Sequence, residues 1–321
     1  MMDALISARD GIIDVDDRIG ILKALPPIGR VAGTLGRWEP WVRAYVILQD
    51  LLAPLRFEPI PDDEDQTDLG LRLLHHGAVK DVELVRITRP SPEAFSLQIA
   101  QVLDWAELRD ERQYEILAQI DPQYAFWSQV LSMRPDRSRH TFELINLVLQ
   151  FCVYVEMKFK HELAVWRPVD LSAQVQPVIT TPGHGAYPMG HATQAYAVAR
   201  VLSGLRELAP DSPAEVQLQR QAARISINRV IAGVHYPIDA TAGRVLGEAI
   251  GHYLLARVGM AVAPWASFDC AGHEMDGTES FEPDEVLART EQDIDAMATI
   301  GVSVLFQAIW DKAQREAEDD L

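Results

Sequence analysis

The residues best suited to chemistry begin with two histidines that flank a short turn. His184 and His191 enclose Gly-Ala-Tyr-Pro-Met-Gly, and a segment with apolar residues at helical spacing follows. The turn 188–190 is expected to lead directly into a helix, whose first N–H groups have no partner within that helix. Such an N-terminus attracts anions, and the flanking histidines can carry protons. A histidine at a helix start is often only structural, so this stretch alone does not identify a catalyst.

A second group of candidate residues precedes the histidines. Lys160 and Arg167 lie seven positions apart, which places both cations within about 20° of one face if the helix continues through them. Pro168 disfavours helical geometry at Arg167 and is expected to end the helix there. Cations near a helix C-terminus are also favoured by the helix dipole alone, in which case they face solvent.

The third group contains a cation in an apolar run and a histidine near a carboxylate. Arg229 follows Asn228, and a guanidinium buried among apolar residues is costly unless it meets an anion. His235 and Asp239 are four apart, so the carboxylate can hold one imidazole nitrogen and leave the other as a ligand or nucleophile.

Helices are expected to position these three groups. A segment from about Arg139 to His161 is apolar around most of its circumference and should lie inside a bundle. Residues 59–68 are acidic and predict a solvated loop or disordered insert, and residues 82–89 fit a short strand or a loop. Further helices are expected at about 38–52, 92–106 with Ser91 as N-cap, 107–120, 121–131, 191–208, 213–232, 237–258 and 283–317. The last of these could complete the core or form a dimer face.

No stretch shows several alternating strands. The sequence therefore predicts one all-α domain over residues 1–321, built as a helical bundle, with the anion site carried by residues 157–240.

Composition restricts the partners of this protein. The 321 residues carry a formal net charge of −18, which argues against nonspecific binding to nucleic acid or to anionic membranes. The sequence shows no signal peptide and no uncharged apolar run of the roughly 18 to 20 residues that a membrane span requires, so a cytoplasmic protein is expected. Cys152 and Cys270 are expected to be reduced thiols.

Together, the three groups resemble one known signature. Lys-x6-Arg-Pro, Pro-x-Gly-His and Arg-x5-His-x3-Asp, in this order over residues 160–239, are similar to the motifs that vanadium-dependent haloperoxidases share with type 2 phosphatidic acid phosphatases. The contexts Trp166-Arg167-Pro168, 186–193 and Gly233-Val234-His235 resemble the haloperoxidases more than the membrane phosphatases. The resemblance implies an all-α fold with a four-helix-bundle core.

The resemblance also implies roles for individual residues. Lys160, Arg167, Arg229 and the Gly190 N–H would hold the oxygens of vanadate, an anion that needs several donors and whose place phosphate could take. His235 would bond the vanadium and be oriented by Asp239. His191 would exchange a proton with hydrogen peroxide. The metal would act as a Lewis acid in the oxidation of halide to hypohalous acid, which then reacts with an organic acceptor.

Four positions qualify this resemblance. Met189 stands where haloperoxidases have a serine that donates to vanadate, and the loss of one charge-assisted hydrogen bond costs roughly 1.5 to 3 kcal/mol. Asn228 replaces a second serine, with a milder effect. His184 resembles an additional histidine of algal bromoperoxidases and favours bromide or iodide over chloride, unless it is an exposed loop residue. Met157 stands one turn before Lys160, at a position that the resemblance associates with the halide.

Three hypotheses follow. The first is a vanadate-dependent haloperoxidase. The second is a soluble phosphatase in which His235 attacks phosphorus and His191 protonates the leaving group. The third, prompted by Met189, is an anion-binding relative with altered or no catalysis. A homo-oligomer is expected, although no motif identifies its interface.

Overall fold

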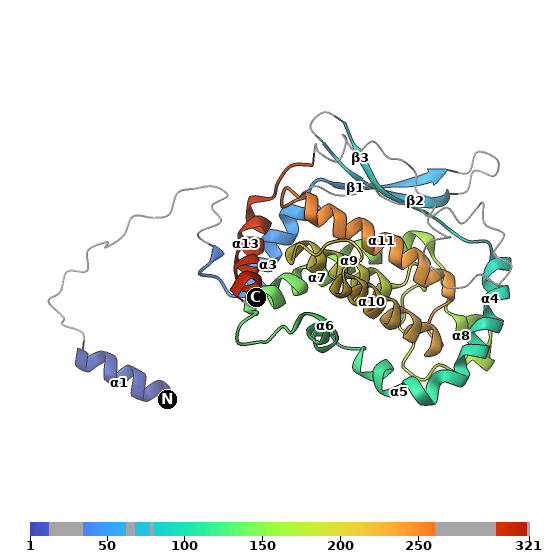
Figure 1. Cartoon of the computed structure of the whole chain (residues 1–321), viewed down its shortest axis with the longest axis horizontal. Coiled ribbons are helices and arrows are strands. Elements are labelled where there is room, and N and C mark those ends of the chain that lie inside the picture. Colours follow the sequence, from blue (N-terminus) through green and yellow to red (C-terminus); the bar gives the residue numbers. More distant parts are fainter. Residues whose placement is uncertain (13–34, 62–67, 78–79, 261–299, 320–321) are drawn as a thin grey trace.

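The computed structural model describes residues 1–12, 35–61, 68–77, 80–260 and 300–319 (Figure 1). The chain is mainly helical in these ranges. Among the longer helices, α7 covers Arg139–Leu163, α9 covers Gly190–Leu205, α10 covers Pro213–Ile231 and α11 covers Pro237–Ala256. The other helices are α1 (Met2–Ile12), α3 (Pro40–Leu52), α4 (Pro92–Trp105), α5 (Arg109–Ala118), α6 (Tyr124–Leu131), α8 (Pro168–Leu171) and α13 (Val304–Asp319), with short 3-10 turns at Ala106–Leu108 and Ala173–Val175.

A small sheet corrects the all-α prediction. Strands β1 (Leu55–Pro61), β2 (Asp68–His75) and β3 (Val82–Thr88) form an antiparallel sheet in the order β1-β2-β3. Both ends of the predicted acidic loop at 59–68 therefore belong to strands, and residues 62–67 lie outside the described residues. Of the two alternatives for residues 82–89, the strand is confirmed. Pro59 and Pro61 are tolerated because β1 is an edge strand, whose outer side needs no ladder hydrogen bonds.

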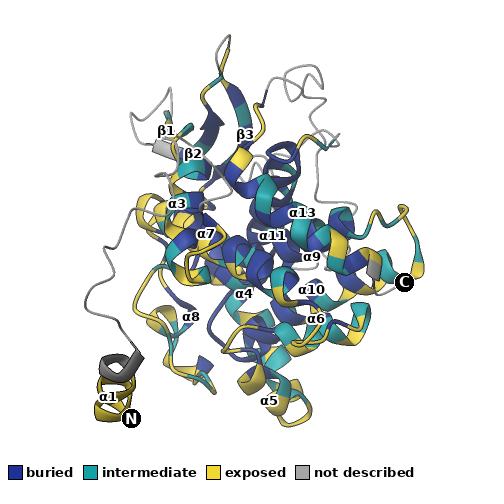
Figure 2. Cartoon of the chain, turned by 90° about the vertical axis from the view of Figure 1, so that its left-hand side faces the viewer, coloured by how far each residue is buried: buried dark blue, intermediate teal, exposed yellow. Residues whose placement is uncertain are grey.

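Helix α9 lies at the centre of the helical part. It contacts α7, α10 and α11, and its side chains from Ala195 to Ala199 are almost completely buried. Figure 2 shows the buried surfaces of α9 and α11 facing the interior, whereas α5 is largely exposed. Apolar burial on this scale is the main favourable contribution to folding.

The C-terminal helix completes the core. Phe306, Ile309 and Trp310 of α13 are buried, and the helix contacts α3, α7 and α9. This confirms one of the two alternatives for the end of the chain, although the first part of the predicted helix, residues 283–299, lies outside the described residues. Cys152 is a buried free thiol, as predicted, and Cys270 also lies outside those residues.

Helix α7 does not reach Arg167. It ends at Leu163, and Ala164 follows in the left-handed conformation with φ 47°. The condition under which Lys160 and Arg167 would share one helical face is therefore not met, and the helix ends before Arg167 rather than at it. Arg167 instead precedes α8 in an extended conformation, where its backbone N–H donates to Asp170 Oδ2 at 2.9 Å. None of the described helices is both long enough and apolar enough to cross a membrane.

Candidate anion-binding site

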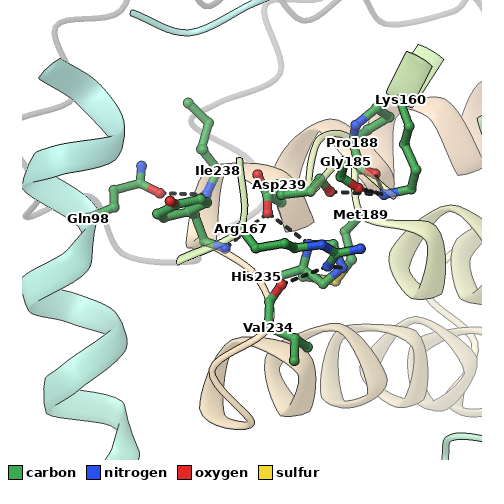
Figure 3. A network of polar contacts seen from close by, with 12 residues as sticks. Gln98, Lys160, Arg167, Gly185, Pro188, Met189, Val234, His235, Ile238 and Asp239 are labelled. Atoms are coloured by element: carbon green, nitrogen blue, oxygen red, sulfur yellow. Dashed lines mark hydrogen bonds and ion pairs between the residues drawn. The ribbon is translucent and has the colours of Figure 1, made fainter. Parts of the chain in front are cut away.

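The turn before α9 and the start of α11 lie against each other (Figure 3). The Met189 N–H donates to the backbone oxygen of Asp239 at 2.9 Å, which ties the two helix N-termini together. Gly243 permits this approach, because a Cβ atom at that position would lie 2.5 Å from the Met189 carbonyl oxygen. The two segments that carry the predicted histidine motifs are thus brought together.

His235 and Asp239 form the predicted buried pair. His235 Nδ1 lies 2.8 Å from Asp239 Oδ2, and the same carboxylate oxygen accepts the Tyr236 N–H at 3.0 Å. With the carboxylate ionised, Nδ1 is the donor and Nε2 keeps its lone pair. A lone pair on Nε2 is what a metal ligand or a nucleophile requires.

Arg167 contacts that lone pair directly. Its Nη1 lies 2.9 Å from His235 Nε2 and donates to the Val234 oxygen at 2.7 Å (Figure 3). Its Nε donates to the backbone oxygen of His184 at 3.1 Å, and Nη2 lies 3.1 Å from His184 Nδ1. Any ligand that bonds to Nε2 must therefore displace Nη1 from this position.

Lys160 is held by the loop that precedes α9. Its Nζ donates to the carbonyl oxygens of Gly185 at 3.1 Å, Ala186 at 2.9 Å and Pro188 at 2.6 Å. Burial, together with the nearby charge of Arg167, lowers the pKa of Lys160 to about 7, whereas Glu156 and Asp239 oppose the shift. The three carbonyl oxygens position the ammonium group, but its charge is poorly stabilised without an anion.

Arg229 is the cation with unused donors. Its side chain is buried, and Nη2 donates to the Ile116 oxygen at 2.8 Å and lies 3.3 Å from Gln119 Oε1. Its Nε and Nη1 atoms are buried and have no hydrogen-bond partner among the described residues. Burial lowers the pKa of Arg229 to about 10. Unpaired guanidinium donors in the interior are costly, and an anion would satisfy them.

His191, in the first turn of α9, is held by a backbone oxygen at the C-terminal end of α5. Its Nε2 lies 2.9 Å from the Gln119 backbone oxygen, which can only accept, so Nε2 carries the hydrogen and Nδ1 has the free lone pair. Burial lowers the pKa of His191 to about 3, and the charges of Arg229, Lys160 and Arg167 contribute. At neutral pH this imidazole is therefore unprotonated and can take up a proton.

A carboxyl group from α7 packs against the start of α9. Met189, at the N-cap position, is fully buried and provides no side-chain hydrogen bond to the helix. A Cβ atom on Gly190 would lie 2.7 Å from Glu156 Oε1, so this carboxyl group packs closely against the first turn. Gln194 donates to Glu156 Oε1 at 3.0 Å, and burial raises the pKa of Glu156. A more neutral carboxyl group opposes a bound anion less strongly.

The two other residues that the resemblance associates with the halide, His184 and Met157, lie at the edge of the candidate site. His184 is exposed and contacts Arg167, whereas Met157 on α7 is partly buried. Sequence reasoning missed Gln119 and Glu156. Glu156 could have been found as a carboxylate one turn before Lys160 in an otherwise apolar helix. Gln119 carries no such signal, because its role depends on the path of the chain after α5.

The free donors and the buried cations of this arrangement suit a tetrahedral oxyanion. The guanidinium of Arg229 has two buried donors without a partner in the described part of the chain, and the charges of Lys160, Arg167 and Arg229 all act on His191. The burial of Lys160 and Arg167 further favours an anionic partner. Met189 remains a departure because a thioether cannot donate.

Comparisons with known proteins add no assignment. No protein-family model matches the chain, and no curated protein matches it.

Proposed function

We propose that this protein is a vanadate-dependent haloperoxidase that oxidises bromide or iodide with hydrogen peroxide. The observation that carries the proposal is the burial of Lys160, Arg167 and Arg229, whose charges all act on His191, together with the two donors of Arg229 that have no partner among the described residues. The order and spacing of the motifs support the same assignment. In this proposal α7, α9, α10 and α11 form the four-helix core of the site.

Each residue has a defined task in this reaction. Arg229 donates to the anion through Nε and Nη1, and Lys160 and the Gly190 N–H supply further positive charge. His235 presents the lone pair of Nε2, and Asp239 fixes its tautomer through Nδ1. His191, unprotonated at neutral pH because burial lowers its pKa, accepts a proton from hydrogen peroxide at Nδ1 when a bound anion offsets the neighbouring positive charges that weaken it as a base. Bound vanadate supplies the Lewis acidity that makes peroxide reactive towards halide.

A soluble phosphatase is the second candidate, favoured by the His235–Asp239 pair. In that reaction His235 Nε2 attacks phosphorus, the bond to the ester oxygen breaks and His191 gives a proton to the leaving group. The lowered pKa of His191 leaves the imidazole unprotonated at neutral pH, so this reaction requires the bound anion to raise that pKa before His191 can act as the acid. An anion-binding protein without turnover is the third candidate, motivated by Met189.

One assay separates the three candidates. The purified protein is incubated with hydrogen peroxide, bromide and an organic acceptor, with and without added vanadate. We expect bromination that depends on vanadate. Absence of such bromination would overturn the first proposal, and hydrolysis of a phosphate ester that vanadate inhibits would establish the second. Vanadate binding without either activity would leave the anion-binding protein.

A further inference from the structure

A large open pocket adjoins the anion site. It has a volume of about 980 Å³ and lies between α3, the segment 120–123, α7 and α9. Pockets that bind small organic molecules commonly have volumes of about 300 to 1,000 Å³. The size therefore suits an organic molecule much larger than halide or peroxide.

The rim of this pocket is apolar and exposed. Tyr45, Ile120, Val153 and Tyr154 line it, and all four are more than 40% exposed: 65%, 52%, 42% and 59%, respectively. They come from three separate segments of the chain and meet around one hollow. Exposed apolar side chains that gather in this way mark a binding surface more often than scattered ones do.

The polar lining is almost uncharged. It consists mainly of side-chain amides, with Asp121 as the acidic group, and neither lysine nor arginine lines the pocket in the part of the chain that the structure describes. Amides can orient a hydroxyl or carbonyl group by hydrogen bonding. An anionic molecule would find no positive charge in the lining and would face Asp121.

The inner end of the pocket reaches the reaction site. His191 and Gln194 both line it from α9. His191 also experiences the charge of Arg229, and Gln194 donates to the Glu156 carboxyl group that packs against Gly190. A molecule held in this pocket is therefore next to the residue assigned to proton transfer.

We propose that this pocket binds the organic acceptor, and that the acceptor is an uncharged, mainly apolar molecule with an electron-rich ring. This inference rests on the proposed haloperoxidase function for its chemistry. Hypohalous acid formed at the site transfers its halogen to a ring carbon: the bond between halogen and oxygen breaks, a carbon–halogen bond forms, and the displaced ring proton joins the hydroxide to give water. Binding beside His191 favours this transfer over release of the acid into solution.

The test measures binding without vanadate or peroxide, so that it can succeed or fail whether or not the protein is a haloperoxidase. Calorimetric titrations compare 2-naphthol, which is neutral, with 2-naphthoate, which has the same rings and a carboxylate. We expect 2-naphthol to bind about tenfold tighter, because the pocket offers no cation to the carboxylate. In protein with labelled histidines, the His191 imidazole signal, identified by its loss in His191→Gln, should shift when 2-naphthol is added.

Two variants locate the bound molecule. Val153→Asp places a charge on the apolar rim and should weaken 2-naphthol binding about tenfold. Leu97→Asp introduces the same change at another exposed apolar position, on α4 outside the pocket, and should have no effect. Equal affinity for the two naphthalene compounds, or unchanged 2-naphthol binding by Val153→Asp, would overturn the proposal. A loss of self-association in Val153→Asp with unchanged 2-naphthol binding would identify the surface as an interface between copies of this chain.

Discussion

The N-termini of α9 and α11 meet at the candidate site, but their first turns differ. In α11, Asp239 accepts the Tyr236 N–H and holds His235 Nδ1, so a carboxylate of the helix itself occupies the positive end. In α9, Met189 provides no side-chain cap and the first turn contains no acidic residue. A helix end already paired with a carboxylate attracts a further anion less strongly. The α9 end is approached only by the Glu156 carboxyl group of α7, whose pKa burial raises. The difference indicates that α11 orients the histidine, whereas α9 is the end better able to accept an anion.

The two arginines of the site also differ in whether their donors already have hydrogen-bond partners. All three side-chain nitrogens of Arg167 contact oxygen or nitrogen acceptors, whereas two of the three in Arg229 have no partner among the described residues. Arg167 must change its contacts when a ligand reaches His235 Nε2, which it now occupies. Arg229 can donate without giving up its existing bonds. Arg229 is therefore the guanidinium better prepared for an anion.

The largest expected effect comes from removing the imidazole at the start of α11. His235→Ala should weaken vanadate binding by more than about 100-fold, because even the loss of a residue that only orients a metal ligand costs about 10- to 100-fold. Calorimetric titration with vanadate measures the change. His252→Ala, on the same helix but distant from its N-terminus, is the control and should bind normally. Unchanged affinity in His235→Ala would refute the ligand role of His235.

Removing the unused donors of Arg229 should have the next largest effect. In Arg229→Met, the loss of each charge-assisted hydrogen bond costs about 1.5 to 3 kcal/mol, so the Kd for vanadate should rise by at least the roughly 10- to 150-fold that one lost bond gives. Arg257→Met removes another buried arginine, which bonds to Tyr253 and Asp50, and should leave vanadate binding intact. Thermal unfolding of both variants separates binding from stability. Normal vanadate affinity in Arg229→Met would place the anion elsewhere.

Anion affinity should depend on the charge of Lys160. Burial lowers the pKa of this lysine to about 7, so the ammonium form predominates below that pH and is lost above it. We expect affinity for tungstate, which keeps its double charge in this range, to fall by up to about tenfold per pH unit above pH 7. The decline measured by calorimetry should disappear in Lys160→Met, which should bind weakly at every pH. The same decline in that variant would assign the dependence to another group.

The smallest effects should come from the N-cap position of α9. Met189→Ser introduces a donor and should tighten vanadate binding by up to about tenfold, since one hydrogen bond to a charged group contributes roughly 1.5 kcal/mol or more. Met189→Asp makes this end resemble that of α11 and should weaken binding by a similar factor. Both residues suit the extended conformation of Met189. If the two variants bind vanadate equally, the contrast between the helices has no bearing on anion binding.

The helical part of the fold could be predicted because its signals are local. Ser91 accepts the Ala94 N–H as the expected N-cap, and the apolar pattern of α7 corresponds to a buried helix. The sheet was missed because Pro59 and Pro61 lie in β1 and residues 59–68 are acidic, so strand signals are weak there. Pairing with β2, the next strand along the chain, forms the strand nevertheless.

The contacts among the candidate site residues could be predicted only in part. His235 and Asp239 pair as their spacing of four indicates, because α11 begins between them. Lys160 and Arg167 approach the same site through a chain reversal that the left-handed Ala164 begins, rather than along one helix. Gln119 was not foreseen, since its contacts with His191 and Arg229 depend on long-range packing of the chain after α5.

A crystal structure of the protein soaked with vanadate tests the central claim most directly. We predict density for the anion between His235 Nε2 and the start of α9, with Arg229 Nε and Nη1 donating to it and Arg167 moved away from Nε2. Vanadate bound elsewhere, or Arg229 still without a partner while vanadate is present, would contradict the claim that these two helix ends and this arginine form one oxyanion site.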